Sequence, residues 1–380
     1  MYTQKKILSE LEYYKNKDFS FKNGQILGSM CTNPHNISKK AYIKFLETNL
    51  GDPNLFPGTK EIEKKYFKFI KNLLNAPSKS DIITGSGGTE SNITAIWIFK
   101  NLSKKREIII PKSAHFSFKK IASLMDIKLK IISLDKNYCM DVKKIKNKIN
   151  TNTAAIIGIA GSTELGTIDK IPEIGDICYD ENIYFHIDAA FGGYIIPFLK
   201  KLRYDLPDFD FKIKGVSSIS IDAHKMGCSV IPIGCLVIRN KEWLEKISVK
   251  TTYISCDEQA GILGTRPGAA VAGAYAISKY YGIKGYKKIV KMCMNNTFYL
   301  ENKIKKIGLN LITKPVTNVI AIKLKNPNKI EKELTKMGWK VNHMKDLSAI
   351  RIVLMPHVTR KIIDAFIQDL KNVCKKNNEI

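Results

Sequence analysis

The sequence lacks any long apolar run and any signal-like N-terminus. Across its 380 residues, no uninterrupted apolar stretch approaches the roughly 18–20 residues that a membrane-spanning helix needs. The first residues, Met1 to Lys6, have neither an apolar core nor a small-residue cleavage site, so we do not expect a signal peptide. These absences predict a cytoplasmic protein with no membrane partner.

Cysteine spacing typical of metal sites is also missing. The eight cysteines form no C-x-x-C pair and no cluster with zinc-ligand spacing; they stand at positions 31, 139, 178, 228, 235, 256, 293 and 374. In a cytoplasmic chain we expect them to be reduced and mostly buried. The sequence therefore predicts no metal site.

Arginine is scarce although the chain is strongly basic. The formal net charge is +27, but only six of the 62 basic residues are arginine, and the lysines are scattered along amphipathic stretches. Recognition of bases and phosphates favours the planar arginine fork, so an excess made of lysine is more typical of a solvated surface. This pattern argues against a nucleic-acid partner and leaves the charge without a functional explanation.

The sequence does contain a regular alternation of apolar strands and amphipathic helices up to about residue 240. The expected strands are 81–84, 108–111, 129–134, 154–160, 184–188 and 216–221, and the helices between or before them include 62–74, 141–149 and 174–181. The segment 154–160 is almost continuously apolar, as in a parallel strand that is covered on both faces. The alternation predicts a mostly parallel, doubly wound α/β sheet.

The pattern changes after about residue 285. Helices expected at 286–307 and 362–374 flank short strands at 319–322 and 350–353, which predicts a small α+β C-terminal domain. We therefore divide the chain into an N-terminal segment (1–50) that contributes to the pocket and dimer, a large domain (51–284) and a small domain (285–380).

A glycine-rich turn, Gly85 to Asn92, lies between the strand 81–84 and an apolar helix. Its glycines let backbone N–H groups approach a ligand, and the dipole of the following helix favours an anion. The turn lacks the Lys-Ser/Thr ending of a Walker loop and the spacing of a dinucleotide fingerprint, so a single phosphate fits better than a nucleotide triphosphate. A tight structural turn is the alternative.

Polar residues follow several of the expected strands at the edge where open α/β sheets bind their ligands. His115 follows the strand 108–111, Thr163 follows 154–160, Asp188 closes 184–188, and Lys225 follows 216–221. A partly desolvated lysine can lose its proton and form a Schiff base with an aldehyde. An acid about 37 residues before a lysine, behind a phosphate-type turn, is the set that pyridoxal 5′-phosphate needs.

The segments His186 to Ala190 and Asp222 to Gly227 are the ones through which the chain resembles a known family. They look like the signatures of the group II pyridoxal-phosphate-dependent amino acid decarboxylases, and the likeness is strongest to the archaeal tyrosine/aspartate decarboxylases. It also extends over residues 28–32, 49–53, 56–59, 85–92, 161–169, 264–268 and 351–360. The resemblance implies an aspartate aminotransferase-like, fold type I protein with a mostly parallel, seven-stranded sheet.

The resemblance also implies roles for individual residues around the cofactor. Lys225 would carry pyridoxal phosphate, Asp188 would pair with its ring nitrogen, His115 would stack on the ring, and Thr163 would support Asp188 or the ring hydroxyl. The remaining contacts would come from Ala190 on the other ring face and, around the phosphate, from Gly88, Thr89, His224 and, from a second subunit, Thr265. That last contact would make a homodimer the functional unit.

Three further residues have open roles. Tyr253 would lie in a mobile loop, 251–261, and protonate the substrate carbon, although a tyrosine in a polar stretch is as readily an exposed one. Arg351 stands in an apolar strand and needs a partner, either a substrate carboxylate or a buried Asp or Glu. Phe56 belongs to a turn-rich segment that would line the substrate pocket, although composition alone fits an ordinary connector as well.

The resemblance implies that tyrosine, aspartate or both are decarboxylated, giving tyramine for methanofuran or β-alanine for coenzyme A in a methanogenic archaeon; glutamate fits less well. Either Tyr253 or Lys225 would return the proton. A fold type I enzyme acting on aminoacyl-tRNA or on sulfur stays open, with Cys256 as its supporting feature. A non-enzymatic nucleic-acid binder on the same scaffold is a third class, and it would bind no cofactor.

Overall fold

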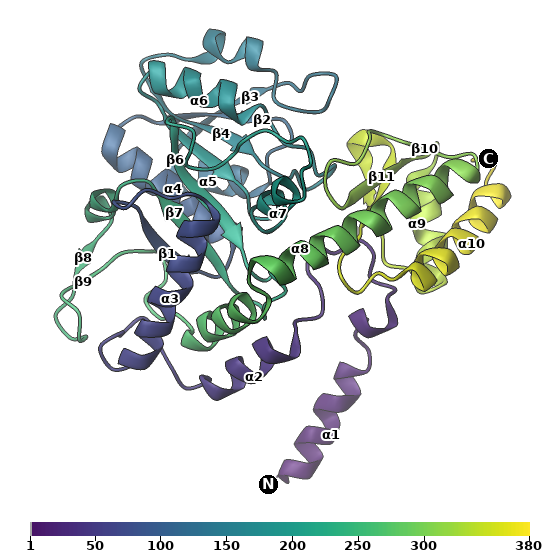
Figure 1. Cartoon of the computed structure of the whole chain (residues 1–380), viewed down its shortest axis with the longest axis horizontal. Helices are drawn as coiled ribbons and strands as arrows, with labels where there is room; N and C mark the ends of the chain where they lie inside the picture. Colours follow the sequence, from purple (N-terminus) through teal and green to yellow (C-terminus); the bar gives the residue numbers. More distant parts are fainter. Residues whose placement is uncertain (1) are drawn as a thin grey trace.

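The structure, a computed structural model, describes residues 2–380 and consists of a large α/β part and a small α+β part (Figure 1). The large part is built on a seven-stranded sheet in the order β1-β7-β6-β5-β4-β2-β3. Its strands are β1 (Asp81–Gly85), β2 (Glu107–Pro111), β3 (Lys128–Ile132), β4 (Thr153–Ile159), β5 (Tyr184–Asp188), β6 (Val216–Asp222) and β7 (Gly234–Ile238).

The strands pair in parallel from β6 through β3, whereas β7 runs antiparallel to both of its neighbours, β6 and β1. Every residue of β4, β6 and β7 is buried, because helices cover both faces of the sheet. The prediction of a mostly parallel, seven-stranded α/β sheet is therefore confirmed.

The helices of the large part alternate with its strands along the chain. They are α3 (Pro57–Leu73), α4 (Gly88–Ser103), α5 (Ser117–Met125), α6 (Ile171–Asp180) and α7 (Ile196–Lys201). In α4 nine of the 16 residues are buried and none is fully exposed, as expected of a helix that lies between the sheet and other elements. Its first turn projects toward the edge of the sheet at which the parallel strands end.

The segment 141–149 was predicted to be a helix, and this prediction is wrong. The structure has two short 3₁₀ turns there, Val142–Lys144 and Lys146–Lys148. The side chain of Asp141 makes no capping hydrogen bond, and four closely spaced lysines repel one another along the segment. Only single turns form, because nucleating an α-helix costs free energy and no capping hydrogen bond offsets that cost here.

The small part contains a four-stranded antiparallel sheet in the order β10-β11-β13-β12, covered by α9 (Pro327–Lys336) and α10 (Arg360–Lys376). Its strands are β10 (Asn310–Leu311), β11 (Val319–Lys323), β12 (Asn342–Met344) and β13 (Ala349–Val353). The predicted strands at 319–322 and 350–353 lie in β11 and β13, and the predicted helix 362–374 lies in α10.

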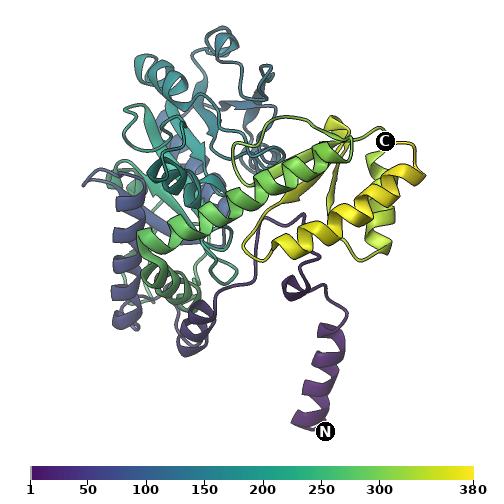
Figure 2. The same cartoon turned by 45° about the vertical axis from the view of Figure 1, so that its right-hand side comes forward.

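One long helix, α8 (Gly268–Lys306), connects the two parts (Figures 1 and 2). Gly282 has non-helical dihedral angles, so the helix is broken there, and the predicted helix 286–307 corresponds to its second half. The predicted domain boundary at residue 284 falls just after this break. The three-segment division itself stays a prediction.

The N-terminal residues pack against both parts. Leu27 lies in the core of the small part, Leu50 lies in the core of the large part, and α2 (Asn36–Lys44) packs on α8. In contrast, α1 (Gln4–Lys15) has no buried residue and projects away from the rest of the chain in both views (Figures 1 and 2). Among residues 2–380, none of the helices combines the length and the apolar character required to cross a membrane.

Candidate active site

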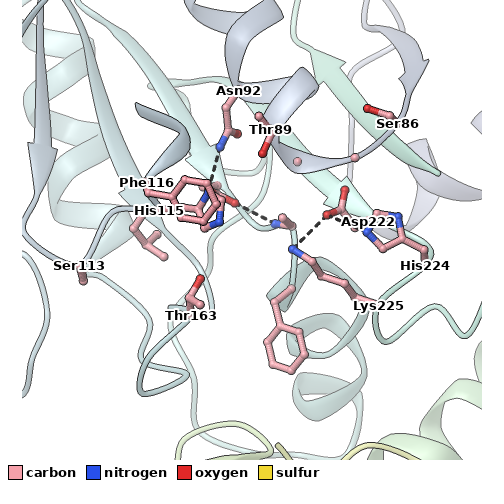
Figure 3. Close-up of a pocket in the computed structure, with 17 residues that line it drawn as sticks. Ser86, Thr89, Asn92, Ser113, His115, Phe116, Thr163, Asp222, His224 and Lys225 are labelled. Atoms are coloured by element: carbon pink, nitrogen blue, oxygen red, sulfur yellow. Dashed lines mark hydrogen bonds and ion pairs between the residues drawn. The ribbon is translucent and has the colours of Figure 1, made fainter. Parts of the chain in front are cut away.

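The polar residues that were predicted at the strand ends surround one cavity of about 350 Å³ (Figure 3). It lies at the edge where β4, β5 and β6 end and α4 begins. The predicted residues that line it are Gly88, Thr89, His115, Thr163, Asp188, Ala190, His224 and Lys225. These eight residues come from five segments of the chain. His115, Thr163, Asp188 and Lys225 were expected at this edge because each lies at or just after the end of a strand, whereas Ala190 and His224 were expected from the family resemblance.

One wall of the cavity is the first turn of α4. A Cβ atom added at Gly88 would lie 2.8 Å from the Ala190 Cβ and 3.3 Å from Asp222 Oδ2, so only hydrogen fits there. The first N–H groups of a helix have no partner within the helix, and its dipole makes this end positive. The turn at Gly88 and Thr89 is therefore a close-fitting backbone cradle for an anion, with the His224 ring beside it.

Asp188, at the end of β5, is buried and accepts hydrogen bonds at both oxygens. Oδ1 accepts from the Ala190 N–H at 3.1 Å and from the Ser220 hydroxyl at 3.3 Å. Oδ2 accepts from the side-chain amide of Asn92 at 2.9 Å. These donors hold the carboxylate in one orientation and stabilise its charge away from water.

Lys225 reaches the cavity from the turn after β6, and its amine lies 3.0 Å from Asp222 Oδ2. Burial lowers the pKa of this amine, but the charges of Asp222 and Asp188 and the hydrogen bond to Asp222 outweigh burial and raise the pKa above its ordinary value. The expectation that desolvation alone would release the proton is therefore wrong for this structure, because two carboxylates face the amine.

His115 forms part of the wall opposite Lys225 (Figure 3). Its Nδ1 accepts a hydrogen bond from the backbone N–H of Ser117 at 3.2 Å, so the ring carries its proton on Nε2 when neutral. Burial lowers its pKa, although Asp188 acts in the opposite direction. A neutral, oriented ring suits stacking on a flat ligand.

Arg351 does not line the cavity, and among residues 2–380 no hydrogen bond joins it to an Asp or Glu side chain. Its guanidinium donates to the Thr163 carbonyl at 2.5 Å, the Gly28 carbonyl at 2.7 Å and the Asn342 side chain at 2.9 Å. Its terminal nitrogens therefore donate to two backbone carbonyls and one side-chain amide, rather than to a buried carboxylate, and its Nε is buried without a partner in the described part of the chain. A contact with a substrate carboxylate stays a prediction.

Phe56, Tyr253 and Thr265 also lie outside the cavity within this chain. Phe56 is half-buried at the start of α3, Thr265 is exposed, and the side chain of Tyr253 is 90% exposed. The loop that carries the last two is fixed at its end by Arg266, which donates to Glu63 at 2.8 Å and to Thr84 at 2.5 Å. Their roles stay predictions.

Two important site residues were missed by sequence reasoning, Asp222 and Asn92. Asp222 begins the segment Asp222 to Gly227, and its position three residues before Lys225 in a tight turn was the available signal. Asn92 lies one turn into α4, four residues after Gly88, and so on the same helix face. That spacing could have suggested a side chain directed into the site.

The residues present fit pyridoxal phosphate on several independent observations. The cradle at Gly88 excludes even a methyl group, a buried carboxylate faces the cavity from β5, and the Lys225 amine belongs to the same lining. In addition, Asp222 Oδ1 and the Ser113 hydroxyl are buried without a hydrogen-bond partner and belong to residues that line the cavity. Such groups are typical of a polar ligand site.

Comparisons with known proteins agree with this geometry. The sequence model of the "Pyridoxal-dependent decarboxylase conserved domain" matches residues 47–325. The chain is 45% identical to an L-aspartate/L-glutamate decarboxylase of Pyrococcus horikoshii, over 97% of each chain. It is 44% identical to a probable L-tyrosine/L-aspartate decarboxylase of Methanosphaera stadtmanae, over 98% of this chain and 97% of the relative.

A solved structure supports the same fold. The sphingosine-1-phosphate lyase of Burkholderia pseudomallei superposes with a TM-score of 0.91, covering 99% of this chain and 91% of that one, at 23% sequence identity. At this level of identity the likeness concerns the fold alone. It agrees with the fold type I architecture that was expected from the sequence.

Proposed function

This chain belongs to the pyridoxal-dependent decarboxylase family, and on that premise we propose that it removes the α-carboxylate of L-aspartate, of L-tyrosine, or of both. It is a carboxy-lyase whose cofactor is pyridoxal 5′-phosphate. Aspartate is the substrate that the names of the two relatives share, whereas glutamate and tyrosine occur in one name each. This overlap supports aspartate as the first substrate to test.

The observation that carries the proposal is the cavity itself, which brings Lys225, Asp188 and the α4 cradle together. When bound, pyridoxal phosphate supplies an aldehyde for an amine and a ring that accepts the electrons released with carbon dioxide. The amine of Lys225 is the group that would hold the aldehyde. Asp188 would keep a proton on the ring nitrogen, and His115 would cover one face of the ring.

Other residues orient and protect the site. The N–H groups at Gly88 and Thr89 would hold the phosphate, and Asp222 fixes the position of the Lys225 amine through their 3.0 Å contact. Exclusion of water limits side reactions at the carbon that loses its carboxylate. Lys225 or Tyr253 would then return a proton to that carbon.

The function is tested by measuring amine release from purified protein supplied with pyridoxal phosphate. Aspartate, tyrosine and glutamate are offered separately, and Lys225→Ala serves as the control. We expect β-alanine, tyramine or both from the wild type and neither from the variant. A yellow, cofactor-loaded protein that releases no amine from any of the three would contradict the substrate assignment and favour the aminoacyl-tRNA or sulfur alternative.

We also propose that two copies share each active site. Within one chain, Tyr253 and Thr265 are exposed and lie outside the cavity, as expected if they serve the cavity of a second subunit. Large exposed apolar side chains on and around α2 support an interface there; they are Ile43 on α2, Leu46 and Leu55 after it, and Tyr280 on α8, the helix against which α2 packs. A 12-residue helix such as α1, which has no buried residue, also needs a packing partner to be stable.

Subunit sharing is tested by mixing two inactive variants. Lys225→Ala removes the amine, and Thr265→Glu would place a carboxylate against the phosphate of the partner's site. If the site is shared, refolding an equal mixture gives heterodimers with one intact site and recovers about a quarter of wild-type activity. No recovery, with both variants folded, would contradict the shared site.

The products suggest a place in metabolism. Tyramine would serve methanofuran synthesis and β-alanine would serve coenzyme A synthesis, in the cytoplasm of a methanogenic archaeon. The substrate measured in the amine-release assay decides between these two supply roles.

A further inference from the structure

Behind the cavity, away from the substrate side, a row of buried polar side chains leads from β6 to Asp188. The hydroxyl of Ser218 lies 2.7 Å from His186 Nδ1, and His186 Nε2 lies 2.9 Å from the side-chain oxygen of Asn92. The amide nitrogen of Asn92 then donates to Asp188 at 2.9 Å. His186 is completely buried and touches neither the cavity nor solvent.

The direction of every hydrogen bond in this row is fixed by chemistry. Asn92 donates both amide hydrogens, one to Asp188 and one to the Ser117 hydroxyl at 3.1 Å, so its oxygen must accept. His186 must therefore carry hydrogen on Nε2. Burial lowers the pKa of His186 to about 4, so the ring is neutral near pH 7 and its Nδ1 accepts from Ser218.

The opposite tautomer would be unfavourable. With hydrogen on Nδ1, the bare Nε2 would face the oxygen of Asn92, or the amide would have to turn and place that oxygen against Asp188. Two acceptors would then meet inside the core, where an unsatisfied or repelling polar contact is costly. The imidazole thus decides which end of the Asn92 amide the carboxylate meets.

We propose that His186 is a positioning residue which, through Asn92, orients the Asp188 carboxylate for its contact with the ring nitrogen of the cofactor. The inference rests on the cofactor site described above, and it does not depend on which amino acid is the substrate. It assigns a function to a histidine that lies two residues before Asp188 in β5, and therefore on the same face of the sheet.

The test compares binding of pyridoxal phosphate with binding of its 1-deaza analogue, in which C–H replaces the ring nitrogen. His186→Leu removes the donor to Asn92 and keeps a buried apolar side chain. His186→Gln keeps the pattern, because its amide nitrogen can donate to Asn92 and its oxygen can accept from Ser218. Thr297→Val, equally buried in α8, is the control for loss of a core polar group.

Loss of a hydrogen bond that supports a charged group is expected to weaken pyridoxal phosphate binding by about tenfold in His186→Leu. Binding of the deaza analogue should change by less than about twofold, because it offers the carboxylate no ring nitrogen. His186→Gln should restore most of the affinity. Equal weakening for both ligands, no weakening for either, or a Gln variant as weak as the Leu variant would overturn the proposal.

A second measurement keeps the proposal testable if the Leu variant does not fold. Nitrogen-15 NMR of the histidine rings in the cofactor-loaded wild type reports the tautomer directly. We expect hydrogen on Nε2 of His186 near pH 7, and hydrogen on Nδ1 would overturn the proposal. Absence of decarboxylase activity would leave both readouts unaffected, so failure of the two proposals can be told apart.

Discussion

Replacing Gly88 with alanine tests the backbone cradle at the start of α4. The added methyl carbon would lie 2.8 Å from the Ala190 Cβ, closer than carbon atoms pack, and 3.3 Å from Asp222 Oδ2. Both neighbours are buried on rigid elements, so the helix start must move outward to make room. That movement displaces the N–H groups proposed to bind the phosphate.

The size of the effect follows from packing and hydrogen-bond energies. An extra methyl group in a close-packed site costs about 1–3 kcal/mol. If that strain falls on the ligand-bound state, affinity for pyridoxal phosphate decreases by about 5- to 150-fold, since each 1.4 kcal/mol is a factor of ten. Titration of apoprotein with pyridoxal phosphate, followed by cofactor absorbance, measures this decrease directly.

Gly58 provides a matched control, because it also lies in the first turn of a helix, α3, and a Cβ there would meet nothing within 4 Å. Gly58→Ala should leave cofactor affinity unchanged and raise the free energy of unfolding by about 0.4–1 kcal/mol through reduced chain entropy. If Gly88→Ala binds the cofactor as tightly as Gly58→Ala does, the phosphate is not held at this turn.

Three further outcomes are expected. Arg266→Met should reduce the free energy of unfolding by about 3–5 kcal/mol, because it leaves Glu63 buried without its charged partner. The double variant Arg266→Met/Glu63→Leu should regain most of this free energy, and urea denaturation measures both changes. Between pH 6.5 and about 4 the histidine binds a proton in the unfolded chain but not as the buried His186 of the folded chain. The free energy of unfolding therefore rises with pH in this window. In His186→Gln this free energy should decrease less when the solution is acidified. Asp222→Asn should lower the pKa of the Lys225 amine, so covalent capture of pyridoxal phosphate should extend to lower pH, and an unchanged pH profile would contradict the pairing.

The sheet and the main site residues could be predicted from sequence because both follow from local patterns. Continuous apolar runs mark buried strands, and polar residues directly after them must gather at one edge of a parallel sheet. His115, Asp188 and Lys225 were located in this way. The roles of Tyr253 and Thr265 rest on family resemblance, since no local pattern brings them to the cavity.

The contacts that tune the site could not be predicted, because they join residues far apart in the chain. Asn92 and Asp188 are 96 positions apart, and Arg351 and Gly28 are 323 apart. Such pairings depend on how layers pack, which periodicity does not report. Arg351 illustrates the difference: its need for a partner was expected, but its terminal nitrogens donate to carbonyl groups from two other segments instead of to a carboxylate.

The reversed strand β7 has a consequence for which substitutions this protein can tolerate. Because β7 begins at the edge where β6 ends, its first residue, Gly234, lies directly beneath the cradle. A Cβ there would overlap Asp222 Oδ1 and lie 2.5 Å from the Cα of Gly87. The main chain of β7 therefore packs directly against Gly87 and Asp222, and saturation mutagenesis should accept only glycine at position 234, even though that residue contributes no functional group.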